Sequence, residues 1–213
     1  MQHKSKRSFV KIGIIDYGLC NLHSISSAIK YLNYDYKFIN KPDDIDKYEK
    51  IILPGVGAFS DGMTGLRENN FIDNLCGYVH NGGHFLGICL GMQMMLTESH
   101  EFGIHKGLNL IEGQVIKIPS EVNSKTHKIP HLGWNKLIVM NNKVNQIAEM
   151  NNYVYFVHSY MVKCDSQYIH ANTKYNDLIM PAIINYKNSY GCQFHPEKSG
   201  QIGLSIIQNF INL

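Results

Sequence analysis

One cysteine lies in a pattern that is typical of a catalytic nucleophile. Cys89 is the middle residue of Gly87-Ile88-Cys89-Leu90-Gly91, where a strand-like apolar segment meets the expected start of a helix. In a nucleophile elbow, a sharp strand-to-helix turn holds the reactive side chain, and small flanking residues are needed because the backbone crowds itself. The partial positive charge at the helix N-terminus then favours the thiolate. The alternative is a core cysteine buried between two glycines.

A base for this thiol is predicted late in the chain. The tripeptide His195-Pro196-Glu197 directly follows an expected strand. If the segment is extended, His195 and Glu197 face the same side, and Pro196 fixes the backbone between them. Glu197 would then orient the imidazole while the other ring nitrogen faces the thiol, as a cysteine nucleophile requires. By itself the tripeptide indicates a surface turn, but beside the elbow we favour the catalytic interpretation.

Backbone N–H groups near the nucleophile could hold the oxyanion of a tetrahedral intermediate. The N–H of Leu90 follows Cys89 directly, and the glycine-rich segment 53–59 leaves the N–H groups of Val56 and Gly57 open to an anion. The same segment could bind a phosphate, but the sequence contains neither G-x-x-x-x-G-K-[ST] nor G-x-G-x-x-G. A glycine-rich strand end without a binding role is the remaining alternative.

The elements that must position these groups alternate in the first half of the chain. Hydrophobic periodicity predicts strands at 9–15, 36–39, 50–53 and 84–88, and helices at 22–32, 71–79 and 90–96. This order indicates an α/β fold with an open, mostly parallel sheet flanked by helices. The second half predicts additional, antiparallel strands at 113–118, 134–139, 153–157, 182–186 and 190–194, and a closing helix at 199–213. We expect both halves to share one sheet system.

Composition narrows the class of protein. The chain has 213 residues, 44% of them hydrophobic and 17% charged, which indicates a globular protein with one core. A net charge of +3 is too small to predict nucleic-acid binding. The five cysteines form no C-x-x-C pair, so we expect a reduced, cytoplasmic chain without a metal site. No apolar run approaches the ~20 residues that cross a membrane. We expect residues 1–8 to be a frayed extension and residues 9–213 a single domain.

Six motifs, spread over nearly the whole chain, resemble those of the class I (triad) glutamine amidotransferases. Within this family they resemble the HisH family, the glutaminase subunits of imidazole glycerol phosphate synthase. The motifs are Ile15-Asp16-Tyr17-Gly18, Leu53-Pro54-Gly55-Val56-Gly57-Ala58-Phe59, Leu86-Gly87-Ile88-Cys89-Leu90-Gly91-Met92-Gln93, Pro130-His131-Leu132-Gly133-Trp134-Asn135, Tyr155-Phe156-Val157-His158-Ser159-Tyr160 and Gln193-Phe194-His195-Pro196-Glu197-Lys198-Ser199. The elbow and the His-x-Glu pattern are common to the whole family, whereas several of the others are specific to HisH.

The resemblance implies a flavodoxin-like amidotransferase domain that hydrolyses L-glutamine to glutamate and ammonia, with no cofactor and no metal. Cys89 would form a thioester, His195 would protonate the leaving ammonia and then activate water, and Glu197 would orient His195. The positions that match the oxyanion region are Val56, Gly57 and Leu90. Those that match the glutamine site are Gly55, Gln93, Glu101, Ser159 and Tyr160.

The resemblance also implies a partner, a HisF-like (β/α)8 barrel that receives the ammonia in a heterodimer. There the ammonia would give imidazole glycerol phosphate and aminoimidazole carboxamide ribonucleotide in histidine biosynthesis. The positions that face the partner are Asn21, Tyr155 and Lys198. Cys20 departs from the family, because relatives usually carry glycine there, and we expect its side chain to enlarge the surface presented to the barrel.

Two other functions remain open at this point. A HisH paralogue could supply ammonia for amidation of a surface or nucleotide-activated sugar, alongside a different synthase. A catalytically silent binding module could keep the same fold, although the intact Cys89, His195, Glu197 and Gln93 argue against it. Neither the catalytic residues nor the glutamine-site residues distinguish histidine synthesis from sugar amidation.

Overall fold

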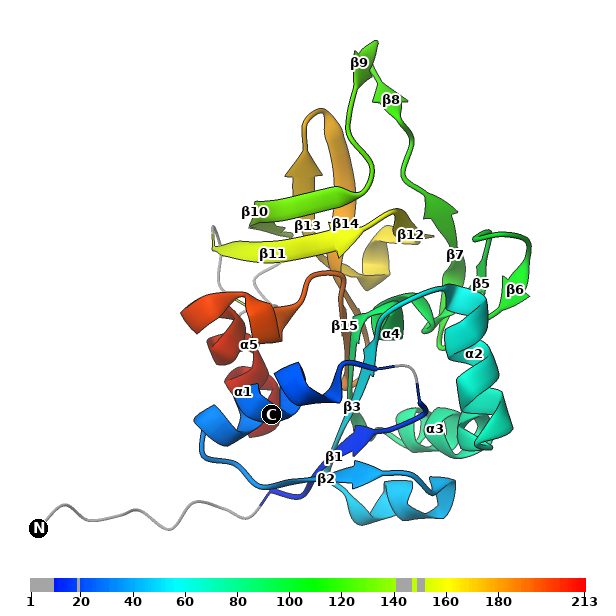
Figure 1. The fold of residues 1–213 in the computed structure, drawn as a ribbon, viewed down its shortest axis with the longest axis vertical. Coiled ribbons are helices and arrows are strands. Elements are labelled where there is room, and N and C mark those ends of the chain that lie inside the picture. Colours follow the sequence, from blue (N-terminus) through cyan, green and yellow to red (C-terminus); the bar gives the residue numbers. More distant parts are fainter. Residues whose placement is uncertain (1–9, 19, 141–146, 149–151) are drawn as a thin grey trace, which may run out of the picture.

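The structure is a computed structural model that describes residues 10–18, 20–140, 147–148 and 152–213. The expected N-terminal extension at 1–8 lies outside the described residues. Figure 1 shows strands and helices alternating in the first half of the chain and mostly strands in the second. In the first half the elements are β1 (Ile12–Ile15), α1 (Leu22–Tyr31), β2 (Tyr36–Ile39), η1 (Pro42–Lys47), β3 (Lys50–Gly55), α2 (Phe59–Glu68), α3 (Phe71–His80), β4 (His84–Cys89) and α4 (Leu90–Gln93).

The second half adds strands and one long helix. The strands are β5 (Leu96–Ser99), β6 (His105–Lys106), β7 (Ile111–Lys117), β8 (Glu121–Val122), β9 (Lys125–Thr126), β10 (His131–Val139), β11 (Tyr153–His158), β12 (Tyr160–Cys164), β13 (Ile169–Tyr175), β14 (Leu178–Tyr186) and β15 (Ser189–Cys192). The 3-10 turns are η3 (Ser166–Tyr168) and η4 (Pro196–Lys198), and the chain closes with α5 (Gly200–Asn212).

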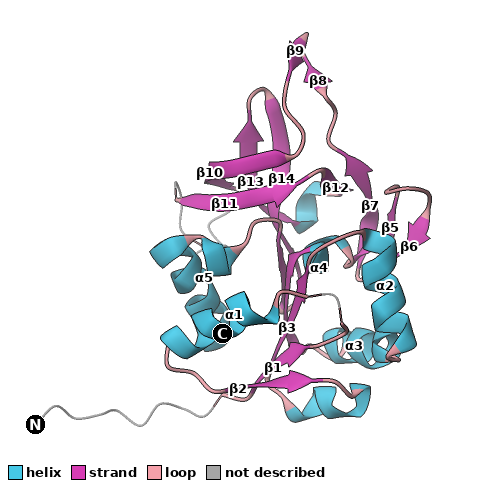
Figure 2. Cartoon of the chain, in the orientation of Figure 1, coloured by secondary structure: helices cyan, strands magenta, loops and turns pink. Residues whose placement is uncertain are grey.

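A nine-stranded sheet joins the two halves, as the sequence predicted. Its order is β11-β10-β13-β14-β15-β4-β3-β1-β2 (Figure 2). The pairs from β15 to β2 are parallel, whereas those from β11 to β15 are antiparallel. The strands β12, β7, β5 and β6 form a separate sheet, and β8 pairs with β9. The carboxyl ends of β3, β4 and β15 therefore meet at one edge, where open α/β sheets place their ligand sites.

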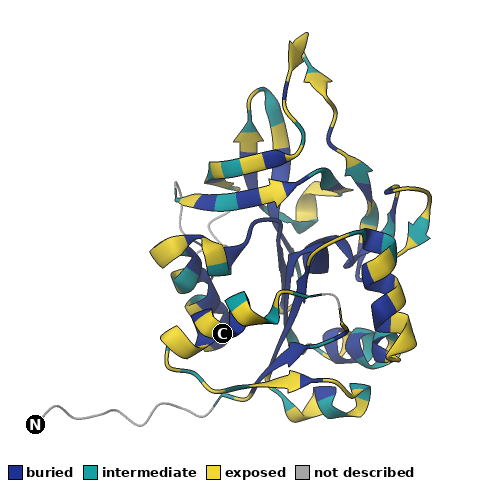
Figure 3. Ribbon diagram, in the orientation of Figure 1, coloured by how far each residue is buried: buried dark blue, intermediate teal, exposed yellow. Residues whose placement is uncertain are grey.

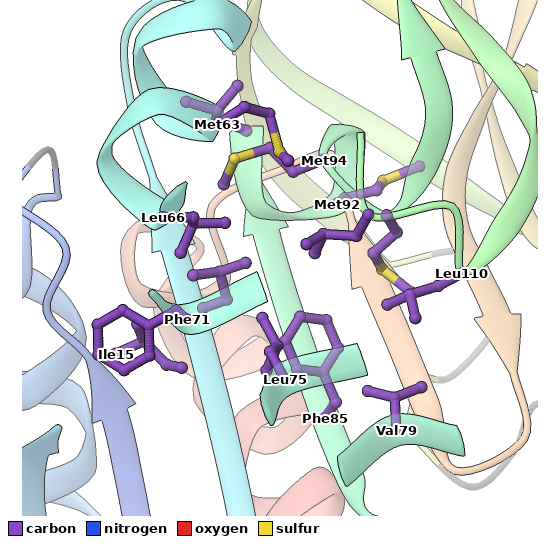
Figure 4. Close-up of a cluster of buried hydrophobic side chains, with 14 of the residues drawn as sticks. Ile15, Met63, Leu66, Phe71, Leu75, Val79, Phe85, Met92, Met94 and Leu110 are labelled. Carbon is purple, nitrogen blue, oxygen red and sulfur yellow. The ribbon is translucent and has the colours of Figure 1, made fainter. Parts of the chain in front are cut away.

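Helices cover both faces of the parallel strands because successive strand residues point to opposite sides. On one face, Ile52 belongs to an apolar cluster that includes residues of α1 and α5. On the other, Ile51 and Leu53 belong to a cluster that includes residues of α2 and α3. Figure 4 shows part of that second cluster, in which Met92 and Met94 fill space between the helices and the sheet. Strands β3 and β4 are almost wholly buried between the two layers (Figure 3).

Two helical predictions were incomplete. The helix expected at 90–96 ends after Gln93, and β5 begins at Leu96; the whole segment is buried, and a short apolar run does not reveal its period. Helix α2 was not predicted because Gly62 and Gly65 lower the helix propensity of its sequence. Gly65 is needed, since a Cβ there would lie 2.8 Å from the Tyr17 carbonyl oxygen, whereas a Cβ at Gly62 would lie 2.8 Å from the flexible Met94 Sδ. Among the described residues, no helix is both long enough and apolar enough to cross a membrane.

Candidate active site

Two of the predicted catalytic residues, Cys89 and His195, line one cavity at the carboxyl edge of the parallel strands, and Glu197 contacts His195 without lining the cavity. Cys89 ends β4, His195 follows β15, and Val56 and Gly57 follow β3. The cavity has a volume of about 400 Å³. Its lining residues are Val56, Gly57, Cys89, Leu90, Gln93, Glu101, Pro130, Val157, His158, Ser159, Tyr160, His195 and Lys198.

The turn at Cys89 has the crowded geometry of a nucleophile elbow. Cys89 has φ 54° and ψ −105°, a backbone conformation that is costly for a residue with a side chain. A Cβ at Gly87 would lie 2.6 Å from the Gly91 carbonyl oxygen, and one at Gly91 would lie 2.0 Å from the Leu53 carbonyl oxygen. Both flanking positions therefore require glycine, as the sequence pattern predicted. The thiol lies beside the first turn of α4 and is 8% exposed.

His195 and Glu197 converge, but not through an extended segment. The His195 Nδ1 and Glu197 Oε1 atoms lie 2.8 Å apart, and both side chains are about 95% buried, with exposed fractions of 4% and 5%. The expected extended geometry is wrong after His195, because Pro196–Lys198 forms the 3-10 turn η4. This turn places the Glu197 carboxylate beside the His195 imidazole. It is closed by the N–H of Lys198, which donates to the His195 carbonyl oxygen at 3.0 Å.

The surroundings of His195 favour its charged form. Burial disfavours the imidazolium, but hydrogen bonds to Cys89 and Glu197 outweigh burial and raise the pKa of His195 to about 10. His195 therefore holds a proton at neutral pH, next to the sulfur and within reach of a leaving group in the cavity. Such a proton is what departing ammonia would need.

Replacing Glu197 by glutamine is expected to lower the free energy of unfolding in a pH-dependent way. The raised pKa of His195 stabilises the fold fully below its ordinary value of 6.5, and this contribution is lost as pH rises through about 10. Each unit by which the Glu197 carboxylate raises the pKa of His195 adds about 1.4 kcal/mol to the free energy of unfolding. The advantage of the wild type over Glu197→Gln should thus be largest near pH 6 and shrink toward pH 10, as measured by urea denaturation.

A matched control is available on the surface. Glu98 pairs with His100 at 3.0 Å, but the two side chains are 29% and 41% exposed. Glu98→Gln should therefore change stability little at any pH in this range. An equal pH dependence in the two variants would contradict a special role for Glu197.

The predicted oxyanion residues Val56, Gly57 and Leu90 line the same cavity as the Cys89 thiol, whereas the neighbouring Gly55 does not. Val56 is 41% exposed, and Gly57 adopts φ +96°, which favours glycine. Leu90 opens α4 directly behind the nucleophile. Gly55, which we expected at the glutamine site, is instead buried at the end of β3 in register with Cys89. A Cβ there would lie 2.8 Å from the Leu90 Cβ, so Gly55 allows β3 to pass close to the elbow.

The remaining predicted glutamine-site residues form a polar wall. The Gln93 amide nitrogen donates to the Tyr160 carbonyl oxygen at 3.2 Å, and Ser159 lies beside it on the cavity lining. Glu101 Oε2 accepts a hydrogen bond from the Phe59 N–H at 2.6 Å, at the start of α2. Glu101 is only 8% exposed, so its carboxylate is held firmly at the cavity wall.

Two residues at the site were not identified from the sequence. The buried Gln193 amide nitrogen lies 3.7 Å from Cys89 Sγ, and its oxygen accepts from Gln93 at 3.1 Å. His158 lines the cavity and contacts the Tyr160 carbonyl oxygen at 2.8 Å. A polar residue two positions before His195 was a usable signal for Gln193, since alternate residues share a side. His158 had no such signal, because its side-chain partner His131 is 27 residues away.

The three predicted partner-facing positions lie around the cavity mouth and the adjacent edge. Lys198 is exposed and lines the cavity. Tyr155 is half-buried and packs against Trp134, with ring centroids 5.9 Å apart. Asn21 is exposed and caps α1, where its side chain accepts from the Ser24 N–H at 3.3 Å.

The expectation that Cys20 enlarges the docking surface is wrong. Its Sγ lies 3.7 Å from the Ile15 carbonyl oxygen, and the half-buried side chain packs against the apolar cluster under α2 and α3. The thiol therefore points into the molecule.

Comparison with protein families and curated proteins gives a consistent result. The family described as glutamine amidotransferase class-I matches residues 13–213. The chain is 45% identical over 210 residues to "Imidazole glycerol phosphate synthase subunit HisH 1" of Legionella pneumophila strain Paris, covering 95% of this chain and 99% of that protein. It is 41% identical over 203 residues to the HisH subunit of Geobacillus sp. strain WCH70, covering 95% of this chain and 96% of that protein.

Solved structures share the fold at much lower sequence identity. "Structure of PurLQS from Thermotoga maritima" matches with a TM-score of 0.75 and 18% identity, covering 96% of this chain and 99% of that chain. "Crystal structure of glutamine amidotransferase" matches with a TM-score of 0.73 and 16% identity, covering 94% and 97%. At these identities the likeness shows the shared fold alone.

Proposed function

Because the chain belongs to the class I glutamine amidotransferases and, within them, to the HisH family, we propose that it is the glutaminase subunit of an imidazole glycerol phosphate synthase. It hydrolyses L-glutamine and supplies ammonia to a HisF-like (β/α)8 barrel in histidine biosynthesis. One observation carries the proposal: Cys89 and the His195–Glu197 pair meet in an amide-lined cavity. The chain is 41–45% identical to curated HisH subunits over nearly its whole length.

The reaction proceeds through a thioester. The Cys89 thiolate attacks the side-chain amide carbon of glutamine, and the oxyanion forms beside the N–H groups of Val56, Gly57 and Leu90. His195 gives its proton to the nitrogen as the carbon–nitrogen bond breaks, so ammonia leaves and a thioester remains. His195 then takes a proton from water, which attacks the thioester and releases glutamate. Burial of the His195–Glu197 pair supports this sequence, because it holds the imidazole in one orientation.

The polar wall opposite Cys89 selects free glutamine. Glu101 supplies a buried negative charge that suits the α-ammonium group, and Gln93 and the Ser159–Tyr160 backbone supply amide donors and acceptors. Gln193, close to Cys89 Sγ, holds Gln93 in place. A cavity of about 400 Å³ accommodates an amino acid of this size but not a folded polypeptide chain.

The barrel docks on the outer face of β10 and β11. This docking face comprises Leu132, Trp134, Tyr153, Tyr155 and Val157, of which Leu132 is 60% exposed and Trp134 53%. Adjacent exposed apolar and aromatic groups are typical of protein interfaces. Val157 and Lys198 connect the docking face to the cavity mouth, so ammonia leaves toward the barrel. Asn21 lies at the start of α1 and extends the interface.

We propose further that residues 9–213 act as one amidotransferase domain in the cytoplasm. The family match over residues 13–213 and the nine-stranded sheet shared by both halves support a single domain. The free thiols support a reducing compartment.

Growth of a histidine auxotroph tests the pathway. A strain that lacks its own HisH should grow without histidine when it receives this chain and the HisF-like barrel from the same genome. No growth, with glutamine hydrolysis intact in the complex, would favour amidation of a sugar by a different synthase. No hydrolysis in any complex would favour a silent binding module.

A further inference from the structure

Two buried histidines form a hydrogen-bonded chain that starts at the cavity wall. His158 Nδ1 lies 2.8 Å from the Tyr160 carbonyl oxygen, and His158 Nε2 lies 2.9 Å from His131 Nδ1. His131 Nε2 lies 3.1 Å from Asn135 Oδ1, and the Asn135 amide nitrogen donates to the Lys174 carbonyl oxygen at 2.8 Å. The chain thus runs from the glutamine cavity to strand β10, whose opposite side is the docking face.

The series of hydrogen bonds from Tyr160 to Asn135 is one hydrogen short while the rings of His158 and His131 are both neutral. The series ends at two carbonyl oxygens, those of Tyr160 and Lys174, and both can only accept. The Asn135 amide nitrogen must therefore donate to Lys174, which leaves its oxygen facing His131. Turning the amide over would place its oxygen against the Lys174 carbonyl oxygen. The three contacts of the two rings with Tyr160, with each other and with Asn135 therefore need three N–H groups. Two neutral imidazoles carry only two. One contact must always lack its hydrogen.

The surroundings keep the rings neutral and fixed in place. His131 is fully buried, stacks on the Phe156 ring with centroids 4.7 Å apart and contacts the tilted Tyr175 ring with centroids 4.2 Å apart. Burial lowers the pKa of His131 and lowers the pKa of His158 to about 3, and the nearby His195 also disfavours a charge on His158. The Tyr175 hydroxyl donates to the Lys128 carbonyl oxygen and is not a partner of either ring.

The missing hydrogen can lie at any of the three contacts. If it is missing between the rings, two nitrogen lone pairs face each other at 2.9 Å. The other two arrangements avoid that clash and link the two ends of the series. In the first register, His158 donates to the Tyr160 carbonyl, His131 donates to His158, and the contact at Asn135 has no hydrogen. In the second, His131 donates to Asn135, His158 donates to His131, and two lone pairs oppose each other at the Tyr160 carbonyl. That carbonyl keeps the Gln93 donor at 3.2 Å, so the second register leaves it partly free to accept from a bound molecule.

We propose that His131 and His158 are positioning residues, whose two hydrogen-bond registers set the Tyr160 carbonyl in the glutamine cavity according to the state of strand β10 at Asn135. The contact at Tyr160 is 2.8 Å and that at the half-buried Asn135 is 3.1 Å, so we expect the isolated chain to adopt the first register. Docking beside Trp134 tightens Asn135 onto His131 and selects the second. The inference rests on the proposed function, because it assigns the carbonyl to glutamine binding.

Nitrogen NMR of histidine-labelled protein reads the registers directly, since it shows which ring nitrogen carries the hydrogen. In the isolated chain, His158 should carry it on Nδ1. In the complex of the chain with its barrel partner and glutamine, with Cys89→Ala to prevent turnover, His158 should carry it on Nε2. The same tautomer of His158 in both states would overturn the proposal.

Variants at Asn135, which does not line the cavity, separate positioning from general stability. Asn135→Ala removes the far acceptor and should hold the first register in the complex, raising the KM for glutamine roughly fivefold to tenfold with kcat little changed. Asn135→Asp places a carboxylate against His131 and should favour its charged form. A charged His131 supplies the third N–H, so His158 should keep its hydrogen on Nδ1 in the complex as well. The control is Thr173→Val, which removes the 3.0 Å hydrogen bond from Thr173 to the Lys136 carbonyl between the same two strands.

The outcomes are distinguishable from failure of the proposed function. If Thr173→Val raises KM as much as Asn135→Ala does, the rise in KM comes from weaker strand pairing, and the proposed coupling through His131 and His158 is wrong. If the unmodified complex hydrolyses no glutamine, the proposed function is wrong. In that case the tautomers of His158 in the Asn135 variants still test the proposed coupling through His131 and His158, because they are measured without turnover.

Discussion

Cys89→Ala abolishes glutamine-dependent synthesis by the complex but leaves synthesis from added ammonia intact. The expected loss is roughly 10⁴-fold or more, because a covalent nucleophile cannot be replaced by the rest of its site. Ammonia-driven synthesis persists because the proposal assigns that reaction to the barrel subunit. The measurement is product formation with glutamine or with ammonium chloride as the nitrogen source.

Cys192 provides the matched control. It lies on β15 in register with Ile88, one residue from the elbow, and is fully buried. Burial raises the pKa of the Cys192 thiol far above its ordinary value, so it stays protonated and unreactive. Cys192→Ala should keep most of the glutamine-dependent activity. Loss of ammonia-driven synthesis in Cys89→Ala would show that the two reactions are not divided between the chains as proposed.

We expect the isolated chain to hydrolyse glutamine roughly 10²–10³ times more slowly than the complex, because that is the typical cost of one missing oxyanion donor. We attribute the difference to the segment Pro54–Gly57, whose peptide plane reorients when the barrel binds. The outer part of this segment has room to move: Val56 is exposed, and a Cβ at Gly57 would meet no atom within 4 Å. The measurement is glutamate release by the chain with and without its partner.

Two glycine variants test whether this loop is responsible. Gly57 has φ +96° and Gly82 has φ +88°, so alanine imposes similar backbone strain at both positions. Gly82 lies before β4, at the opposite end of that strand from the cavity. Gly57→Ala should change the ratio of activated to basal rate, whereas Gly82→Ala should change stability alone. A chain that is equally active alone and in complex would refute latency.

Local sequence predicted the parts of the fold that depend on local patterns. β2 was predicted with its observed bounds, and the predicted ends of β3 and β4 were one or two residues short. The glycines of the elbow were predictable because a Cβ there would strike backbone atoms. The pairing of His195 with Glu197 followed from spacing, even though a 3-10 turn rather than a strand produces it.

What local patterns could not predict depends on contacts between distant residues. Strand β12 pairs with β7, and β13 with β10 and β14, in registers that no short segment encodes. The spacing from His195 could have placed Gln193 on the side of the site, but its contacts with Gln93 and Cys89 join residues about a hundred positions apart. Cys20 was misjudged because its side chain turns toward Ile15, and a departure from a family pattern does not tell in which direction a side chain points.

The most direct test of the account is to count products. The chain is mixed with the HisF-like barrel from its own genome, with glutamine as the only nitrogen donor and the ribonucleotide substrate in excess. The account predicts one imidazole glycerol phosphate and one aminoimidazole carboxamide ribonucleotide for each glutamate released. Glutamate released without either product, while added ammonia still yields both, would contradict the transfer of ammonia from this chain to that barrel.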